Sequence, residues 1–200
     1  MGGIFSKDLW AAAGDDDADR IRALVRQGVD VNAPNENGAT PLFYAALKGN
    51  LAVLLALIEG GADISRATNQ GFTALFIASS KGHLICARAL LNAGAIVDQA
   101  KNDGATPLLV ASYEQHIGLI QLLLAAGASV DHGRNDGATP LLIASQFGHF
   151  RVIRELLKAN ARLDATMHDG ASPLYVGDEG LVRGGGVRGV LCVWCMACVR

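Results

Sequence analysis

The chain has 200 residues, of which 50% are hydrophobic and 18% are charged, and its formal net charge at pH 7 is −2. This balance argues against a nucleic-acid-binding protein, which normally has a basic face, and no run of 18 or more apolar residues suggests a transmembrane helix. The start of the chain lacks the basic and apolar stretches of a secretory signal. Three of the four cysteines are crowded at the end of the sequence, unlike a disulfide framework, so we expect a reducing, intracellular setting.

The N-terminal segment, residues 1–8, matches the N-myristoylation pattern M-G-x-x-x-[ST], with Gly2 exposed after removal of Met1 and Ser6 in the last position. One acyl chain gives only marginal membrane binding. Lys7 is followed by several aspartates, which offer a membrane little attraction. We therefore expect any attachment through Gly2 to be reversible.

Four aspartates follow closely in the chain. Negative charge is favourable at the start of a helix, so we interpret them as a solvated helix start, with a cation site as the alternative. These residues are Asp15, Asp16, Asp17 and Asp19.

A short motif then recurs at one spacing, 33 residues, with no insertion or deletion. A fixed period of this length indicates a repeat architecture. The glycines of the motif are Gly38, Gly71, Gly104, Gly137 and Gly170.

The first full unit shows how each repeat is expected to fold. Gly38 suits a tight turn because glycine accepts a positive φ. Thr40 is expected to cap a first helix that begins at Pro41 and stops at Gly49. A second helix over residues 50–61 has apolar residues at three- and four-residue spacing, which we expect to form its buried face. These are Leu51, Leu54, Leu55 and Ile58.

These motifs resemble the ankyrin repeat family, whose pattern runs roughly D-x-x-G-x-T-P-L-H-x-A-A-x-x-G-H-x-x-x-V-x-x-L-L-x-x-G-A-D-x-N. The stretch "NDGATPLLVASYEQHIGLIQLLLAAGASVD" is one of the copies. The resemblance implies an all-α solenoid of stacked helix-turn-helix units joined by β-turn or hairpin loops, within residues 9–176. Its expected parts are a divergent cap at 9–34, full repeats at 35–67, 68–100, 101–133 and 134–166, and a partial repeat at 167–176.

The chain departs from the family pattern at several positions. Gln115 and Asn160 stand where glycine is usual, and asparagine tolerates the left-handed conformation better than most residues. An apolar residue replaces the histidine of the pattern in every repeat, so we expect apolar packing there in place of a hydrogen bond. These residues are Phe43, Phe76, Leu109, Leu142 and Tyr175.

Nothing in the sequence points to catalysis. His83, His116 and His149 recur once per repeat, and the resemblance assigns them to the start of each second helix rather than to a metal site. Cys86 is expected to be a small core residue. The chain has no phosphate-binding glycine loop, nucleophile elbow or paired catalytic carboxylates. We therefore expect a non-enzymatic protein without a cofactor or a metal.

Residues 177–200 form a Gly- and Cys-rich tail that we expect to be poorly ordered. The glycines from Gly177 onward do not favour the second helix of a fifth repeat, so we interpret residues 167–176 as a truncated repeat. Cys192, Cys195 and Cys198 supply three ligands, whereas a structural zinc site has four. An incomplete or intermolecular metal site, palmitoylation and the absence of any designed role stay open for them.

The resemblance places partner binding on the loop tips and on the exposed side of each first helix, which form an extended concave surface in stacked repeats. Aromatic side chains dominate binding hot spots, so we expect a groove centred on Phe72, Tyr113 and Phe147. The candidate partner-binding residues are Leu47, Lys48, Phe72, Lys81, Tyr113, Glu114, Gln146 and Phe147.

The sequence thus predicts a cytoplasmic, non-catalytic interaction module or scaffold for an unidentified protein partner, and no nucleic-acid partner. The alternative is an ankyrin adaptor that an acylated Gly2 tethers reversibly to a membrane. Only in that case do we expect a membrane partner and a peripheral membrane location.

Overall fold

The computed structural model describes residues 2–165, with side chains from Asp8 onward. The chain divides into two compact units, Met1–Asn102 and Asp103–Arg200, called unit 1 and unit 2. The predictions for the partial repeat at 167–176 and for the tail at 177–200 lie outside the described residues. Within the described range the secondary structure is helical apart from one isolated bridge between Ala67 and Thr73.

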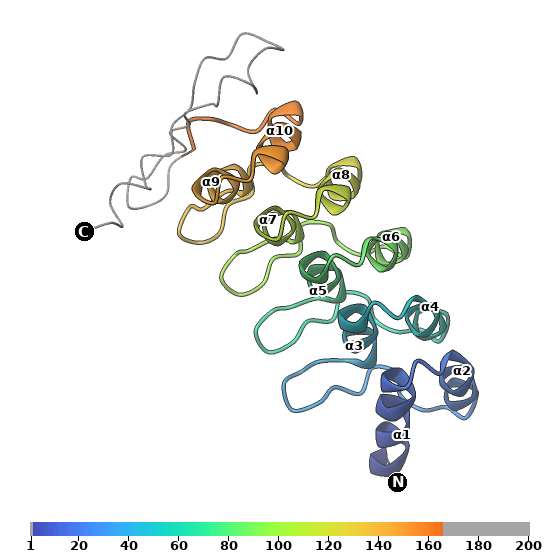
Figure 1. Ribbon diagram of the computed structural model, residues 1–200. Coiled ribbons are helices and arrows are strands. Elements are labelled where there is room, and N and C mark those ends of the chain that lie inside the picture. Colours follow the sequence, from blue (N-terminus) through green and yellow to red (C-terminus); the bar gives the residue numbers. More distant parts are fainter. Residues whose placement is uncertain (1, 166–200) are drawn as a thin grey trace. The chain divides into compact units, whose positions relative to one another are not determined.

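Unit 1 consists of three pairs of short helices (Figure 1). In this unit α1 packs on α3 and α3 on α5, and these helices form its inner layer, while α2 packs on α4 and α4 on α6 in its outer layer. Helix α1 begins at Gly2, so most of the N-terminal segment 1–8 is helical. The helices are α1 (Gly2–Gly14), α2 (Ala18–Arg26), α3 (Pro41–Lys48), α4 (Leu51–Glu59), α5 (Ala74–Lys81) and α6 (Leu84–Asn92).

Unit 2 repeats this arrangement in its described part. There α7 packs on α9 in the inner layer and α8 packs on α10 in the outer layer. The helices are α7 (Pro107–Tyr113), α8 (Ile117–Ala125), α9 (Pro140–Gln146) and α10 (Phe150–Lys158). Over the part of the chain that the structure covers, none of the helices is both long enough and apolar enough to cross a bilayer.

Local chemistry fixes where the inner helices begin and end, as the sequence predicts. The Thr40 hydroxyl accepts a hydrogen bond from the Phe43 N–H at 3.2 Å, and Pro41 is the first residue of α3. Gly49 ends this helix with a φ of 76°, a left-handed conformation that favours glycine. The same threonine cap starts α5, α7 and α9, at Thr73, Thr106 and Thr139.

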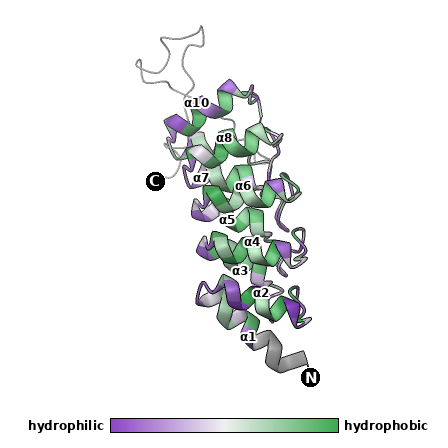
Figure 2. Ribbon diagram, turned by 90° about the vertical axis from the view of Figure 1, so that its right-hand side faces the viewer, coloured by the Kyte–Doolittle hydropathy of each residue, from purple (hydrophilic) through white to green (hydrophobic). Residues whose placement is uncertain are grey.

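The predicted buried face of the second helix is only partly correct: Leu54 is buried, Leu51 and Ile58 are half-buried, and Leu55 is exposed. Helix α4 buries Val53, Leu54, Ala56 and Leu57, whereas Leu55 is 38% exposed. The reason is that residues 51–58 are apolar on every side of the helix, so three- and four-residue spacing fits more than one face. Figure 2 shows the uniform hydrophobicity of α4, which is hydrophobic along nearly its whole length, whereas α2 of the same unit has both hydrophobic and hydrophilic residues.

The departures from the repeat pattern behave as expected except at Phe43, which is only half-buried. Phe76, Leu109 and Leu142 are buried where the pattern has histidine, while Tyr175 lies outside the described residues. Gln115 and Asn160 adopt left-handed φ angles of 61° and 62°. Cys86 is buried in α6, and burial raises the pKa of its thiol.

The loops between repeats are held to one another through asparagines, and the main-chain groups of the preceding loop are the partners. In unit 1 the Asn69 N–H donates to the Asn37 carbonyl at 2.9 Å, and the Asn69 side-chain amide donates to the Glu36 carbonyl at 3.1 Å. Asn102 repeats this one loop later, where its side chain donates to the Asn69 carbonyl at 3.0 Å. These bonds set the positions of successive loops beside the inner helices.

Candidate functional site

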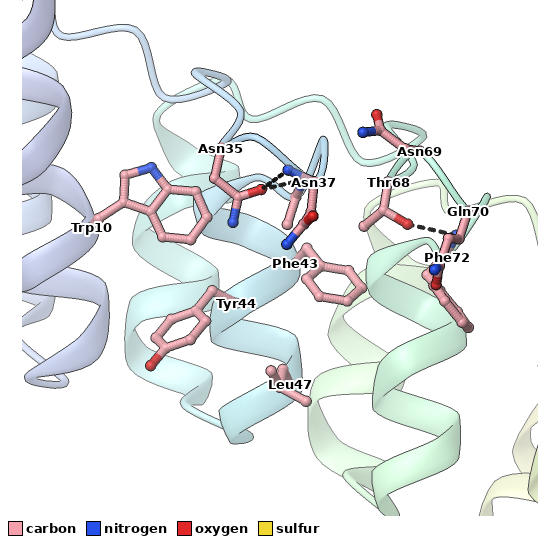
Figure 3. A pocket seen from close by; sticks show the side chains of 11 residues that line it. Trp10, Asn35, Asn37, Phe43, Tyr44, Leu47, Thr68, Asn69, Gln70 and Phe72 are labelled. Carbon is pink, nitrogen blue, oxygen red and sulfur yellow. Dashed lines mark hydrogen bonds between the residues drawn. The ribbon is translucent and has the colours of Figure 1, made fainter.

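Unit 1 has a pocket of about 410 Å³ at the junction of its inner helices and its first two loops, residues 32–40 and 65–73 (Figure 3). Helix α1 contributes Trp10, and α3 contributes Phe43, Tyr44 and Leu47. The two loops contribute the remaining side chains, which are mostly polar, and none of the lining residues is charged. These loop residues are Asn35, Asn37, Ala39, Thr68, Asn69, Gln70 and Phe72.

Aromatic rings form the walls of this pocket in two edge-to-face pairs. The centroids of Trp10 and Tyr44 lie 5.8 Å apart with an interplanar angle of 61°. Those of Phe72 and Phe76 lie 5.3 Å apart at the same angle. Aromatic rings favour this geometry because the positive edge of one ring meets the negative face of the other. Since Phe76 is buried, it supports Phe72, whose ring is half-buried at the pocket.

The polar side chains of the pocket divide into structural and unengaged ones. The Asn35 side-chain oxygen accepts hydrogen bonds from the N–H groups of Asn37 and Ala39, both at 3.0 Å, and so closes the first loop. Thr68 closes the second loop, because its hydroxyl accepts from the Phe72 N–H at 3.1 Å. The side chains of Asn37 and Gln70 form no hydrogen bond within the described residues. They are therefore available to a ligand.

Lysines lie beside the aromatic walls. The Lys48 Nζ is 5.5 Å from the centroid of the Tyr44 ring, and the Lys101 Nζ is 5.1 Å from that of the Phe72 ring. Both distances fall within the range of cation–π attraction, about 6 Å. Lys81 ends α5 as Lys48 ends α3. Lys48 and Lys81 are exposed and form no ion pair among the described residues.

Three acids of unit 1 form ion pairs with arginines of α2, and none of these residues lines the pocket. Arg20 binds Asp8 at 3.2 Å. Arg22 binds Asp19 at 3.0 Å and Glu59 at 3.5 Å. These three acids lie on α1, α2 and α4, whereas Lys48 and Lys81 lie at the ends of α3 and α5.

Unit 2 brings together two of the predicted partner-binding residues. Tyr113 and Phe147, at the ends of α7 and α9, are 47% and 49% exposed, and their ring centroids lie 5.1 Å apart at an interplanar angle of 86°. The His149 ring stacks on Phe147, and its Nε2 lies 3.0 Å from the Tyr113 carbonyl oxygen. Phe72, the third residue of the predicted centre, belongs to unit 1 and contacts Phe76 instead.

The other predicted site residues lie at the C-terminal ends of the inner helices. Leu47 lines the pocket of unit 1 and is half-buried. Glu114 directly follows α7 and is exposed, whereas Gln146 ends α9 and is half-buried.

Trp10, Phe43 and Tyr44 are aromatic pocket residues that are not among the site residues predicted from the sequence. Tyr44 precedes the predicted residue Leu47 by three positions in one helix, which is the spacing of side chains that share a face. This spacing could have indicated Tyr44. Trp10 had no comparable signal, because it lies in the divergent first repeat.

His83 and Asp17, two further candidates from the sequence, have structural roles. In unit 1 the His83 Nε2 lies 3.2 Å from the Leu47 carbonyl oxygen, which ties the start of α6 to the end of α3. Asp17 caps α2 and accepts from the Arg20 N–H at 2.9 Å, as expected for a helix start. In the described range, no three His, Cys, Asp or Glu residues are grouped so that they could hold a metal ion.

Stacked pairs of short helices with interlocked loops define a helical repeat protein. Three copies of a model for ankyrin repeats match residues 9–101, 53–136 and 95–169, which together span most of the sequence. The chain belongs to the ankyrin repeat family, as its sequence motifs indicate. No curated protein matches the chain significantly.

Proposed function

We propose that this chain is a non-catalytic protein–protein interaction module, as ankyrin repeats generally are. It binds a protein partner on the inner layer and loops of unit 1. The pocket of about 410 Å³ is the observation that carries this proposal. Its volume lies within the range of ligand pockets, about 300–1,000 Å³. The exposed pair Tyr113 and Phe147 supplies a second candidate contact surface in unit 2.

The chemistry of the pocket suits a protein ligand. Large aromatic side chains supply much of the energy of protein interfaces, and Phe72 is already held in place by Phe76. Because a supported side chain loses little conformational freedom on binding, its contact area contributes more fully to affinity. The unengaged amides of Asn37 and Gln70 can bond to the backbone of a partner.

Comparative affinity purification tests the proposal. The full chain, the variants Leu47→Ala and Phe72→Ala, and the control Ile85→Ala would be used as baits, with bound proteins quantified by mass spectrometry. Ile85 is a suitable control because it is a large apolar residue of α6, 64% exposed, in the outer layer of the same unit. We expect specific partners to be retained by Ile85→Ala and lost with Phe72→Ala.

The same set of proteins on all four baits would contradict binding at this pocket. A Tyr113→Ala/Phe147→Ala bait, run in parallel, tests the second surface. If partners are lost only with this double variant, binding belongs to unit 2.

The second candidate function is that of an adaptor tethered reversibly to a membrane, and the Gly2 motif supports it. We infer a cytoplasmic location for the module, with a membrane-bound fraction if Gly2 is acylated. Fractionation of cells that express the wild type or Gly2→Ala tests both ideas. We expect the wild type to divide between membrane and soluble fractions and Gly2→Ala to be soluble. An unmodified N-terminus in mass spectrometry of the wild type would exclude the tether.

A further inference from the structure

We propose that the partner segment bound by the pocket of unit 1 is an acidic peptide. In this segment a large apolar side chain enters the pocket, and aspartates or glutamates lie a few residues away. The inference rests on the proposed function, because it specifies the chemistry of the partner at the same pocket. Three features of unit 1 carry it: the aromatic walls, the unengaged amides and the placement of the lysines.

The aromatic walls select the anchor. Trp10, Tyr44 and Phe72 surround an uncharged pocket, so a charged side chain would lose its hydration there without gaining an opposite charge. An aromatic or branched aliphatic side chain instead gains contact area from several rings. The anchor is therefore apolar.

The amides suit an extended backbone. Asn37 and Gln70 lie on the two neighbouring loops above the pocket (Figure 3), and each side-chain amide can both donate to a carbonyl and accept from an N–H. An extended peptide offers alternating N–H and C=O groups along its length. Two amides on successive loops therefore hold the backbone while the anchor is in the pocket.

The lysines select the charge of the flanking residues. Lys48 and Lys81 occupy equivalent places, at the C-terminal ends of two neighbouring inner helices, and both are exposed. Lys101 lies over the Phe72 ring. A basic peptide would meet the two exposed cations Lys48 and Lys81 here, whereas an acidic one meets complementary charge.

The lysines are not a requirement of the fold. Lysine at a helix C-terminus is favourable because of the helix dipole, which would explain Lys48 and Lys81 without any ligand. The equivalent positions of unit 2 are Glu114 and Phe147, and neither α7 nor α9 has a basic residue in its last turn. Inner helices of this chain thus form without a cation at that place.

The positions of the acids follow from the length of α3. This helix has 8 residues, so it is about 12 Å long at about 1.5 Å per residue. An extended peptide covers that distance with about four residues. Leu47 lies at the end of α3 away from the loops (Figure 3), and Lys48 follows it. We therefore place the acids within about four residues of the anchor, on the side that leads away from the loops, where Glu36 at the first loop does not oppose them.

Selection from a phage-displayed library of random dodecapeptides on the full chain is the test. We expect enriched peptides to combine one large apolar residue with acids on one side of it. The affinity of a synthetic peptide from this set would then be measured for the wild type, Lys48→Gln/Lys81→Gln and the matched control Arg26→Gln/Arg88→Gln. The control removes two exposed arginines from the outer helices α2 and α6 of the same unit.

We expect the lysine double variant to bind about tenfold more weakly and the arginine control to bind as the wild type does. The affinity of the wild type should fall as salt is raised from about 0.05 to 0.5 M, because exposed charge pairs are screened. Phe72→Ala should weaken binding at every salt concentration. Circular dichroism melts would verify that all variants are folded.

The outcomes that contradict the acidic peptide differ from those that contradict the proposed function. Enriched peptides that are basic, neutral or proline-rich would overturn the inference and leave the interaction module standing. Equal binding of an oligothymidine of similar length would also overturn it, because the lysines would then be a general anion site. If the wild type enriches no peptide over Phe72→Ala, the proposed function of this pocket fails as well.

Discussion

The two units of this chain share one local architecture and differ in the chemistry that it presents. The residue directly before the glycine of the repeat motif differs between the units. It is an amide in unit 1, Asn37 or Gln70, and a carboxylate in unit 2, Asp103 or Asp136. The inner helices α3, α5, α7 and α9 each start at a capping threonine. The residues that build the repeat and those that we propose to face a partner therefore occupy separate positions.

The inner-helix ends show the same contrast. Lys48 and Lys81 in unit 1 correspond to Glu114 and Phe147 in unit 2. Unit 1 thus has an aromatic pocket and lysines at the ends of two inner helices, and unit 2 has an exposed aromatic pair and an acid at the equivalent helix end. This difference is why we assign the acidic peptide to unit 1.

Core truncation would show whether the two units are also separate in stability. Leu42 in α3 and Leu141 in α9 occupy equivalent positions and are each 1% exposed. Leu42→Ala and Leu141→Ala should each lower the free energy of unfolding by about 2–5 kcal/mol. Hydrogen exchange measured by mass spectrometry should show the greatest loss of protection in the unit that holds the substitution. Equal loss in both units would mean that they unfold as one.

A glycine at the end of the inner helices should be more costly to replace in unit 1 than in unit 2. Gly49 and Gly148 both have positive φ, but a Cβ on Gly49 would lie 2.6 Å from the His83 Nδ1, whereas one on Gly148 would meet nothing within 4 Å. Gly148→Ala should cost about 1 kcal/mol from the left-handed backbone. Gly49→Ala should cost about 3 kcal/mol, because His83 must also move and lose its bond to Leu47. Urea unfolding measures the free energy of unfolding of both variants, and an equal loss in the two would contradict the role of His83.

Unit 2 can be stabilised where it departs from unit 1. Gln115 has a φ of 61° at the position that Gly49 and Gly82 occupy in unit 1. Gln115→Gly should raise the free energy of unfolding by about 1 kcal/mol, since relief of backbone strain outweighs the added freedom of the unfolded chain. Asn160→Gly is the control in the same unit and should gain less, because asparagine tolerates this conformation. A loss of stability in Gln115→Gly would show that its side chain makes a contribution that outweighs the strain.

The loop carboxylate of unit 2 should give a small dependence of stability on pH. The paired Arg134 guanidinium, together with the Ala138 N–H, lowers the pKa of Asp136 to about 2. The folded state favours the ionised form of Asp136. The contribution of this carboxylate to the free energy of unfolding is therefore complete above the ordinary pKa of about 3.9 and is lost as the pH falls toward 2. We expect this contribution to be about 0.5 kcal/mol, since the pair of Arg134 and Asp136 is partly exposed and screened by water.

Urea unfolding of the wild type and Asp136→Asn at pH values from about 6 to 2 measures this contribution. The wild type should lose more stability than the variant over the acid range, and parallel curves would exclude the effect. The corresponding positions of unit 1, Asn37 and Gln70, do not titrate and should show no such difference on substitution.

The sequence predicted those parts of the fold that depend on local chemistry. Thr40, Pro41 and Gly49 act within one or two turns of a helix, so their roles could be inferred without knowledge of any neighbour. The buried face of α4 could not be predicted in this way, because Leu55 and Leu57 are equally apolar and only packing against other helices distinguishes them.

The candidate site was only partly predictable for a similar reason. Leu47, Lys48 and Phe72 follow from their places in the repeat. Which side chains meet is a tertiary property: the contact of Trp10 with Tyr44 joins a divergent first helix to the next inner helix, and Tyr113 meets Phe147 across two repeats of unit 2.

The asparagines that join the loops hold each loop in place independently of the side chains that would determine which ligand is bound. Asn69 and Asn102 bond to carbonyl oxygens of the preceding loop, and every amino acid supplies such an oxygen. The side chains at Glu36 and Gln70 can therefore be exchanged freely while each loop keeps its place. An engineer who wished to redirect this chain to a new ligand would vary those positions and leave the asparagines untouched.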